Sequence, residues 1–261
     1  MFFWSKKRRR QKLLAESFPQ EWQPYLEENV WQYACLVSER RAKLHDCLRI
    51  FITEKQWVGC GGMEITDEVR VTIAGQACLL LLGVPGEYCF DHVKSVLVYP
   101  SEFTQPPELQ NRHWIVDEEQ AVLGEAWRSG PVILSWQHVL QEGHCRYDGR
   151  NLVLHEFAHQ IDALDGEMGG SPPLGYSAEG KHFKHVVERE FLRLEDAVRR
   201  RRPTLLDSYG AANRAEFFAV ATECFFEQPR PLKQLHPELY EVLAAFYCLD
   251  PARWTRQSHL A

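Results

Sequence analysis

The stretch NLVLHEFAHQ, residues 151–160, has two histidines four residues apart, with a glutamate directly after the first. On an α-helix, His155 and His159 lie one turn apart on the same face, so both imidazoles can reach one metal ion. Glu156 lies beside them, within reach of a metal-bound water. Zinc in such a site lowers the pKa of the water from about 15.7 to about 7. The pattern therefore predicts zinc-assisted hydrolysis with Glu156 as the general base.

The residues around this pattern strengthen the prediction. The five letters alone arise by chance in roughly a few per cent of chains of this composition. A helix that runs through the interior tolerates ionisable groups only where they have partners, and a metal ion is such a partner. We therefore favour a metal site over solvent-facing or ordinary core histidines. The flanking side chains are all uncharged: Leu152, Val153, Phe157, Ala158, Gln160 and Ile161.

A third protein ligand is needed, and two candidates follow soon after the histidines. The metzincin spacing requires glycine at 162 and histidine at 165, but this chain has Asp162 and Asp165. Asp165 remains a candidate ligand, whereas Asp162 is expected to support the site from behind the ligands. Glu179 lies within the gluzincin spacing, but in a segment rich in glycine and proline.

The other candidates are Glu216 and Glu223, seven residues apart on one face of the apolar segment AEFFAVATECFFE. A buried carboxylate needs a partner, and a metal ion provides one. We expect Glu216 to be the ligand and Glu223 to orient one of the histidines. Tyr209, seven residues before Glu216, is placed to hydrogen-bond the oxyanion of the reaction, although a tyrosine in such a segment is often an ordinary core residue.

The pattern of the whole chain predicts an α+β fold. Residues 21–58 have near-helical spacing of aromatic residues, and residues 68–85 suggest a short strand followed by a buried helix. Strands are expected at 93–103, stopped by Pro100, and at 130–136, whose edge could bind an extended substrate or pair within the sheet. Helices are expected at about 152–164, 181–201, 213–227 and 237–249. The loop 166–180 either gates the site or simply connects two helices.

Residues 21–261 are expected to form one domain with a helical N-terminal part, since no long linker divides them. Residues 1–20 are expected to form a flexible tail. The basic run Lys6–Arg10 within it could contact anionic lipid or nucleic acid.

Composition excludes several classes of function. The net charge of −6 gives no general attraction to nucleic acid, so no direct nucleic-acid partner is expected. Eight cysteines without a C-x-x-C pair, and no secretion signal, indicate reduced thiols in the cytoplasm. No apolar run approaches the roughly 18 residues of a membrane span.

Several stretches resemble the bacterial Mlc titration factor A family of zinc peptidases, whose catalytic core is similar to that of anthrax lethal factor. They are LVLHEFAHQIDALDG, DSYGAANRAEFFAVATECFF, VLVYPSEF, GPVILSW and FYCLDPARW, and the resemblance covers about residues 20 to 254. It implies a zincin-like core, in which the H-E-x-x-H helix and a second ligand helix pack against a small mixed sheet. It also implies that His155, His159 and Glu216 hold one zinc ion, with Glu156 as general base and Tyr209 assisting.

The resemblance further implies aminopeptidase-type activity on short peptides and, in enteric relatives, binding of a glucose repressor. The alternative is a non-catalytic protein in which zinc staples two helices and the chain sequesters a transcriptional repressor. A site closed by a fourth protein ligand, such as Asp165 or His182, would favour that alternative. Glu156 favours catalysis, because a purely structural site does not need it.

Overall fold

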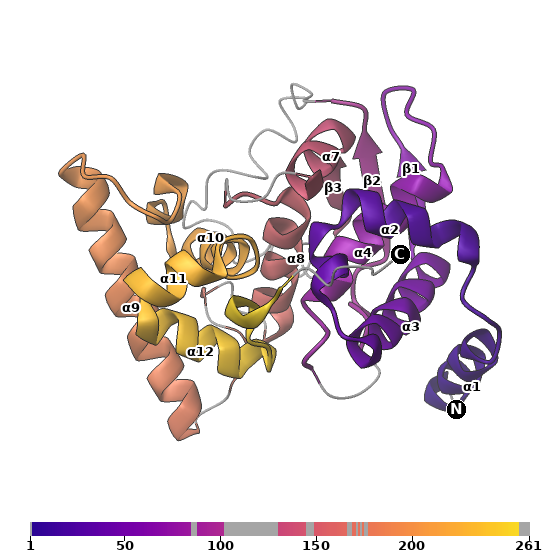
Figure 1. The fold of residues 1–261 in the computed structure, drawn as a ribbon, viewed down its shortest axis with the longest axis horizontal. Coiled ribbons are helices and arrows are strands. Elements are labelled where there is room, and N and C mark those ends of the chain that lie inside the picture. Colours follow the sequence, from indigo (N-terminus) through magenta and orange to yellow (C-terminus); the bar gives the residue numbers. More distant parts are fainter. Residues whose placement is uncertain are drawn as a thin grey trace.

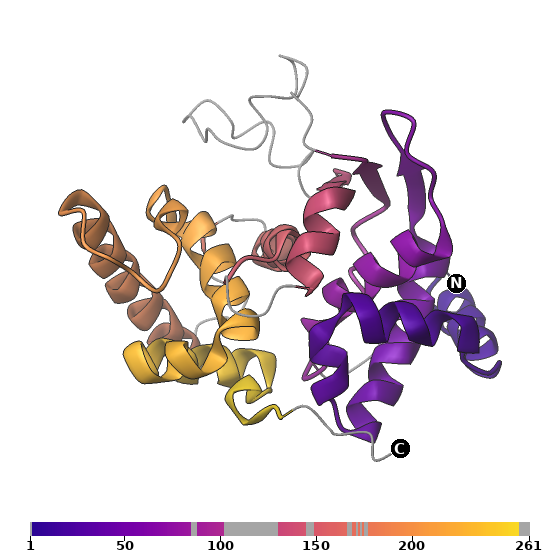
Figure 2. The ribbon, with the colours of Figure 1, turned by 45° about the horizontal axis from the view of Figure 1, so that its top comes forward.

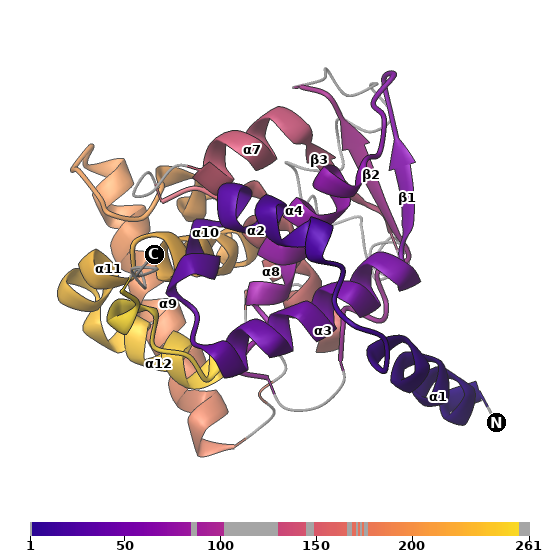
Figure 3. The same cartoon turned by 45° about the vertical axis from the view of Figure 1, so that its right-hand side comes forward.

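The structure is a computed structural model that describes residues 2–84, 88–101, 130–144, 149–165, 169–170, 172, 174 and 177–255. Two groups of elements lie on either side of helix α8 (Leu152–Asp162), as Figure 1 shows. Elements between residues 2 and 144 form one group, and helices from the last third of the chain form the other. The views of Figure 2 and Figure 3 show the same division.

The N-terminal group combines helices with a small sheet. Its helices are α1 (Phe2–Leu14), α2 (Gln23–Asn29), α3 (Ser38–Glu54) and α4 (Asp67–Leu79), with the short turns η1 (Gln20–Trp22) and η2 (Trp31–Cys35). Its strands are β1 (Gln56–Gly59), β2 (Ser95–Tyr99) and β3 (Val132–Ser135), and helix α7 (Trp136–His144) follows β3 directly.

The described strands form a parallel sheet in the order β1-β2-β3. Val58 pairs with Leu97, and Leu97 pairs with Ile133. Parallel neighbours need long crossover connections, and the first crossover here contains α4. The expected α+β class is confirmed. The expected mixed sheet is not found among the described residues, where every pairing is parallel.

Two segments differ from the sequence prediction. Residues 68–79 were expected to begin with a strand, but they belong to α4, whose N-terminus is capped by Thr66 accepting from the backbone N–H of Val69. The run Val71–Leu79 is buried on every side, so packing and the cap outweigh the strand preference of its β-branched residues. Residues 56–58 were expected to be helical, but they belong to β1 because they pair with β2.

The C-terminal group contains α9 (Ala178–Arg199), η5 (Ser208–Ala211), α10 (Arg214–Glu227), α11 (Pro229–Leu235), α12 (Pro237–Tyr247) and η6 (Pro251–Arg253). Helices α9, α10 and α12 confirm the sequence prediction within a few residues at their ends. Every residue from Ala215 to Glu227 of α10 is buried, because α8, α9, η5, α11 and α12 all pack against this helix. The expected loop at 166–180 lies largely outside the described residues.

Helix α1 occupies the place where a flexible tail was expected. It lies at the edge of the molecule beside α3 (Figure 3). Arg10 is only 5% exposed, and it donates from Nε and Nη2 to Glu54 at 2.9 and 2.7 Å. Arg49 of α3 donates to the carbonyl of Leu13 near the C-terminus of α1. No helix among the described residues is long and apolar enough to cross a membrane.

Replacement of Arg10 should make the free energy of unfolding depend less on pH between neutral and acidic conditions. Burial raises the pKa values of Glu54 and Asp91, but ion pairs with Arg10 and Lys6 outweigh it and lower both. The pairs therefore stabilise the protein above the ordinary carboxyl pKa, and this stabilisation is lost as the pH falls through the lowered values. We expect Arg10→Met to lower the free energy of unfolding by about 2 kcal/mol at neutral pH and by much less near about pH 3.

Urea denaturation at both pH values measures this difference. Arg9→Met is the matched control, because the Arg9 side chain is 68% exposed and has a single ion-pair contact of 3.5 Å with Glu54. An Arg10→Met deficit of equal size at both pH values would show that these carboxylates are not what Arg10 stabilises.

Helices α2, α4 and α7 pack closely together near Gly143 of α7. Gln76 of α4 donates from Nε2 to the carbonyls of Asn29 (3.3 Å) and Val139 (3.2 Å). Gly143 lies against this junction, where an added Cβ would stand 2.4 Å from the Asn29 oxygen and 2.5 Å from Gln76 Nε2. A side chain at position 143 would therefore push α7 away from α2 and α4.

Gly143→Ala should destabilise the protein although alanine favours helices. The gain in helix propensity is about 1 kcal/mol, whereas forced overpacking costs about 1–3 kcal/mol. We expect the overpacking to win by about 1 kcal/mol, measured as a lower melting temperature. Gly169→Ala is the control, because a Cβ at Gly169 meets nothing within 4 Å. An unchanged or raised melting temperature for Gly143→Ala would show that the junction relaxes freely.

Candidate metal centre

Helix α8 presents one apolar face and one polar face. Asn151 caps it, because its Oδ1 accepts from the backbone N–H of Leu154 at 2.9 Å. The apolar side chains point into the core, while His155, Glu156 and His159 are half-buried on the other face. This burial pattern follows from the helical period of the sequence. The buried apolar residues are Val153, Leu154, Phe157, Ala158 and Ile161.

Helix α10 brings a line of carboxylates against α8. Asn213 caps it by accepting from the backbone N–H of Glu216 at 3.0 Å, which places Glu216 in the first turn. Glu216, Glu223 and Glu227 are 8%, 7% and 0% exposed. Such buried carboxylates are costly unless they have hydrogen bonds or a cation.

The three predicted ligands come together where α8 and α10 pack. His155 Nε2 lies 3.1 Å from Glu216 Oε2 and 3.2 Å from His159 Nε2. His159 Nε2 lies 3.4 Å from Glu216 Oε2. Ligand atoms of these three residues all lie within 4.8 Å of one another, which is close enough for a single metal ion to contact all of them.

Hydrogen bonding behind His155 sets the chemistry of this cluster. His155 Nδ1 lies 2.7 Å from Glu223 Oε1, which accepts its proton. The Nε2 atom of a neutral His155 then carries a lone pair that faces Glu216 Oε2, another acceptor. His159 Nδ1 has no hydrogen-bond partner among the described residues. No hydrogen bond at Nδ1 therefore fixes which ring nitrogen of His159 carries the proton. Converging acceptors repel one another, and a cation satisfies them; the donor set therefore fits a metal ion.

The pKa shifts in the cluster also show that its carboxylates favour a positive charge beside them. Burial lowers the pKa of His155, but the carboxylates of Glu216 and Glu223 outweigh burial and raise it above the ordinary value. Burial raises the pKa of Glu216, but hydrogen bonds to His155 and His159 outweigh burial and lower it to about 2. Glu216 therefore stays ionised at neutral pH.

Tyr209 stands beside the cluster on η5. Asp207 fixes this segment by accepting the backbone N–H of Tyr209 at 2.9 Å. The rings of Tyr209 and His155 have centroids 6.1 Å apart. Burial and the charge of Glu216 raise the pKa of Tyr209, so its phenol stays protonated and can donate a hydrogen bond. Tyr209 thus lies next to the candidate ligands.

A buried network behind His155 was only partly predicted from the sequence. Glu223 Oε2 accepts the backbone N–H of Asn151 at 2.7 Å, and Asn151 Nδ2 donates to Glu227 Oε1 at 3.0 Å. Glu227 also accepts from Trp31 Nε1 and Gln32 Nε2, each at 2.7 Å. The spacing of 216, 223 and 227 on one apolar helix was a signal for Glu227. Its partners in η2, nearly 200 residues away, had no such signal.

Asp162, Glu179 and His182 are not part of the described cluster. Asp162 is fully buried, and its Oδ2 accepts the backbone N–H of Gly170 at 2.9 Å, which anchors the chain after α8. Glu179 and His182 are exposed on the first turns of α9, so Glu179 lies on a helix and not in the expected loop. Asp165 belongs to the turn η4 (Ala163–Asp165), and its side chain lies outside the described part.

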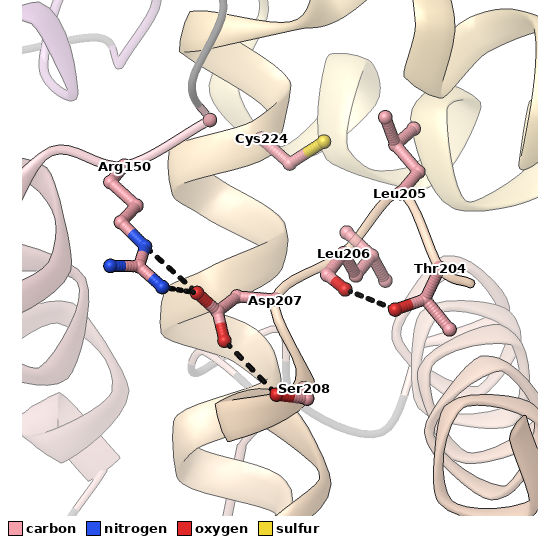
Figure 4. A pocket seen from close by; sticks show the side chains of 8 residues that line it. Arg150, Thr204, Leu205, Leu206, Asp207, Ser208 and Cys224 are labelled. Carbon is pink, nitrogen blue, oxygen red and sulfur yellow. Dashed lines mark hydrogen bonds and ion pairs between the residues drawn. The ribbon is translucent and has the colours of Figure 1, made fainter. Parts of the chain in front are cut away.

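A pocket of about 510 Å³ lies between residues 149–150, residues 204–208 and Cys224 of α10, and Figure 4 shows it. None of the three candidate ligands lines it, so this hollow is separate from the cluster. Arg150 donates from Nε to Asp207 Oδ2 at 2.9 Å across it, and this ion pair joins the start of α8 to the segment that carries Tyr209. The lining residues are Gly149, Arg150, Thr204, Leu205, Leu206, Asp207, Ser208 and Cys224.

Comparison with known proteins identifies the family. Residues 4–248 match the family described as glucose-regulated metallo-peptidase M90. The chain belongs to this family. It is 38% identical over 245 residues to an uncharacterized protein of Synechocystis sp., covering 93% of this chain and 89% of that protein. It is 30% identical over 230 residues to Mlc titration factor A of Klebsiella pneumoniae, with 87% and 86% covered. The resemblance inferred from the sequence motifs is confirmed, and the family description indicates a metal-dependent protein.

Glu223→Gln should weaken metal binding without removing a ligand. The amide has one acceptor oxygen and cannot accept from both His155 Nδ1 and the backbone N–H of Asn151, so the imidazole loses its fixed orientation and some of its basicity. Loss of such a partner costs about 10- to 100-fold in metal affinity. Competition with a zinc chelator measures this change. Glu179→Gln is the control and should keep the wild-type affinity, because Glu179 is exposed and outside the cluster. Equal affinities for all three proteins would contradict the role of Glu223.

Proposed function

We propose that the protein is a zinc-dependent peptidase with a zincin-like core. The observation that carries this proposal is the convergence of His155 Nε2, His159 Nε2 and Glu216 Oε2 beside Glu156. Two imidazoles and one carboxylate form the ligand set of catalytic zinc in several hydrolases. Membership of a metallo-peptidase family supports the same reading.

His155, His159 and Glu216 would hold the ion. When bound there, zinc supplies a Lewis acid that polarises the scissile carbonyl and acidifies a water molecule. Glu156 takes the proton from the attacking water and delivers it to the leaving amine. Its place directly after His155 puts its carboxylate on the half-buried polar face of α8, beside the ligands.

Tyr209 and Glu223 complete the machinery. Tyr209, kept protonated by burial and by the charge of Glu216, donates a hydrogen bond from its phenol to the oxyanion that forms during attack. Glu223 holds His155 in the tautomer that leaves Nε2 free to bind. Asp162 acts one step further away by anchoring the segment after α8 through Gly170.

The substrate class that we propose is short peptides, cleaved in the manner of an aminopeptidase, in the cytoplasm. The sequence motifs shared with the Mlc titration factor A family support this substrate class. The seven described cysteines are free thiols, in keeping with a reducing compartment. Strand β3 ends the described sheet, so its outer edge is the proposed place for an extended peptide backbone.

We propose a second role, the binding of a transcriptional repressor. The support is the name Mlc titration factor A, carried by relatives that match more than four fifths of this chain. This role does not require catalysis. The alternative account, in which zinc only staples α8 to α10 and the chain sequesters the repressor, therefore needs a direct test.

Glu156→Gln provides that test. The amide cannot take a proton, so we expect peptide hydrolysis to fall by about 10²- to 10⁴-fold. Zinc content should stay at one ion per chain, because Glu156 is not a ligand. Digestion of a peptide library by the wild type and the variant, with metal analysis of both, measures the two quantities. Full hydrolysis by a zinc-loaded variant would rule Glu156 out as the base.

Two further variants separate the competing accounts. Glu216→Ala should remove zinc, whereas Asp165→Ala should keep both zinc and hydrolysis. The reverse result would make Asp165 the third ligand. If the zinc-loaded wild type cleaves no peptide in the library but binds a repressor, the sequestering account is correct.

A further inference from the structure

The basic run at the N-terminus is a feature that the proposed peptidase does not use. It lies in α1, which carries six positive charges and no acidic residue. The whole chain has a net charge of −6, so the six charges of α1 leave −12 for the remaining residues. Positive charge is therefore concentrated on one helix of an otherwise acidic protein. The six residues are Lys6, Lys7, Arg8, Arg9, Arg10 and Lys12.

One face of α1 is fixed to the protein. Arg10 is buried between Glu54 and Asp91, and Lys6 Nζ lies 3.0 Å from Asp91 Oδ1. Arg49 holds the carbonyl of Leu13 at the other end of the helix. These contacts fix the rotation of α1 about its own axis, so its outward face is set by the fold.

The outward face is cationic. Arg8 and Lys12 lie one turn apart and about 160° around the helix from Arg10. Both are exposed, as are their neighbours Lys7 and Arg9. In Figure 3, α1 lies at the edge of the molecule, with its N-terminal end pointing away from the other elements. A flat anionic surface can therefore approach this face.

We propose that α1 binds the negatively charged surface of a lipid membrane. Each Lys or Arg near such a surface favours binding by about fivefold. The first residues of the helix are Phe2, Phe3 and Trp4, and aromatic residues beside basic ones are typical of helices that lie in the lipid headgroup region. Duplex nucleic acid offers no apolar layer for them, so lipid fits α1 better. The contact is peripheral, because no described helix can span a membrane.

Vesicle sedimentation of the full chain tests this proposal. The wild type should bind vesicles of phosphatidylcholine mixed with phosphatidylserine, should not bind phosphatidylcholine alone, and should dissociate as salt is raised. Arg8→Gln combined with Lys12→Gln should weaken binding by about 25-fold. Phe2→Ser combined with Phe3→Ser keeps every charge and should also weaken binding.

The matched control is Arg201→Gln combined with Arg202→Gln. It removes two exposed charges from the other basic run, at the end of α9, and should leave vesicle binding nearly unchanged. Unchanged zinc content and unfolding midpoint show that each variant folds. An equal loss in the control, no preference for phosphatidylserine, or binding of a DNA duplex in place of vesicles would overturn the proposal. Unchanged binding of the Phe2 and Phe3 variant would also overturn it.

Discussion

The packing of α8 against α10 depends on one electrostatic constraint. Two imidazole nitrogens and a carboxylate oxygen lie within 3.1 to 3.4 Å of one another, and all three are acceptors when both histidines are neutral and carry their proton on Nδ1. Glu223 strengthens this arrangement by holding the proton of His155 on the far side of its ring. A proton on His155 satisfies part of this cluster, whereas a metal ion between the helices satisfies all three lone pairs together, so metal binding is expected to stabilise the packing of α8 against α10.

A chain of buried hydrogen bonds holds α8 and α10 in place on the side of His155 that faces away from the other two ligands. Asn151 begins α8 and also links Glu223 to Glu227, while Glu227 reaches Trp31 and Gln32 in the N-terminal group. The ligand helices are thereby tied to elements from both ends of the chain. Rigid support of this kind suits the proposed peptidase, because small errors in the position of a reacting group cost large factors in rate.

Local sequence patterns predicted the helices α8 and α10 better than the elements around them. Local patterns predicted α8, α10 and the meeting of His155, His159 and Glu216, since helical spacing and buried charge are both visible in the letters. The strand expected in residues 68–85 was wrong, because burial on all sides of α4 removes the alternation that separates strand from helix. Strand β1 and the η2 partners of Glu227 depend on contacts between residues distant in the chain, which no local pattern records.

X-ray absorption at the zinc edge, combined with metal analysis of the purified chain, tests the central claim most directly. The account predicts one zinc per chain, bound by two imidazole nitrogens and oxygen ligands that include an exchangeable water. Glu216→Ala should abolish this signal. A chain that binds no zinc, or a site closed by four protein ligands without water, would contradict the account.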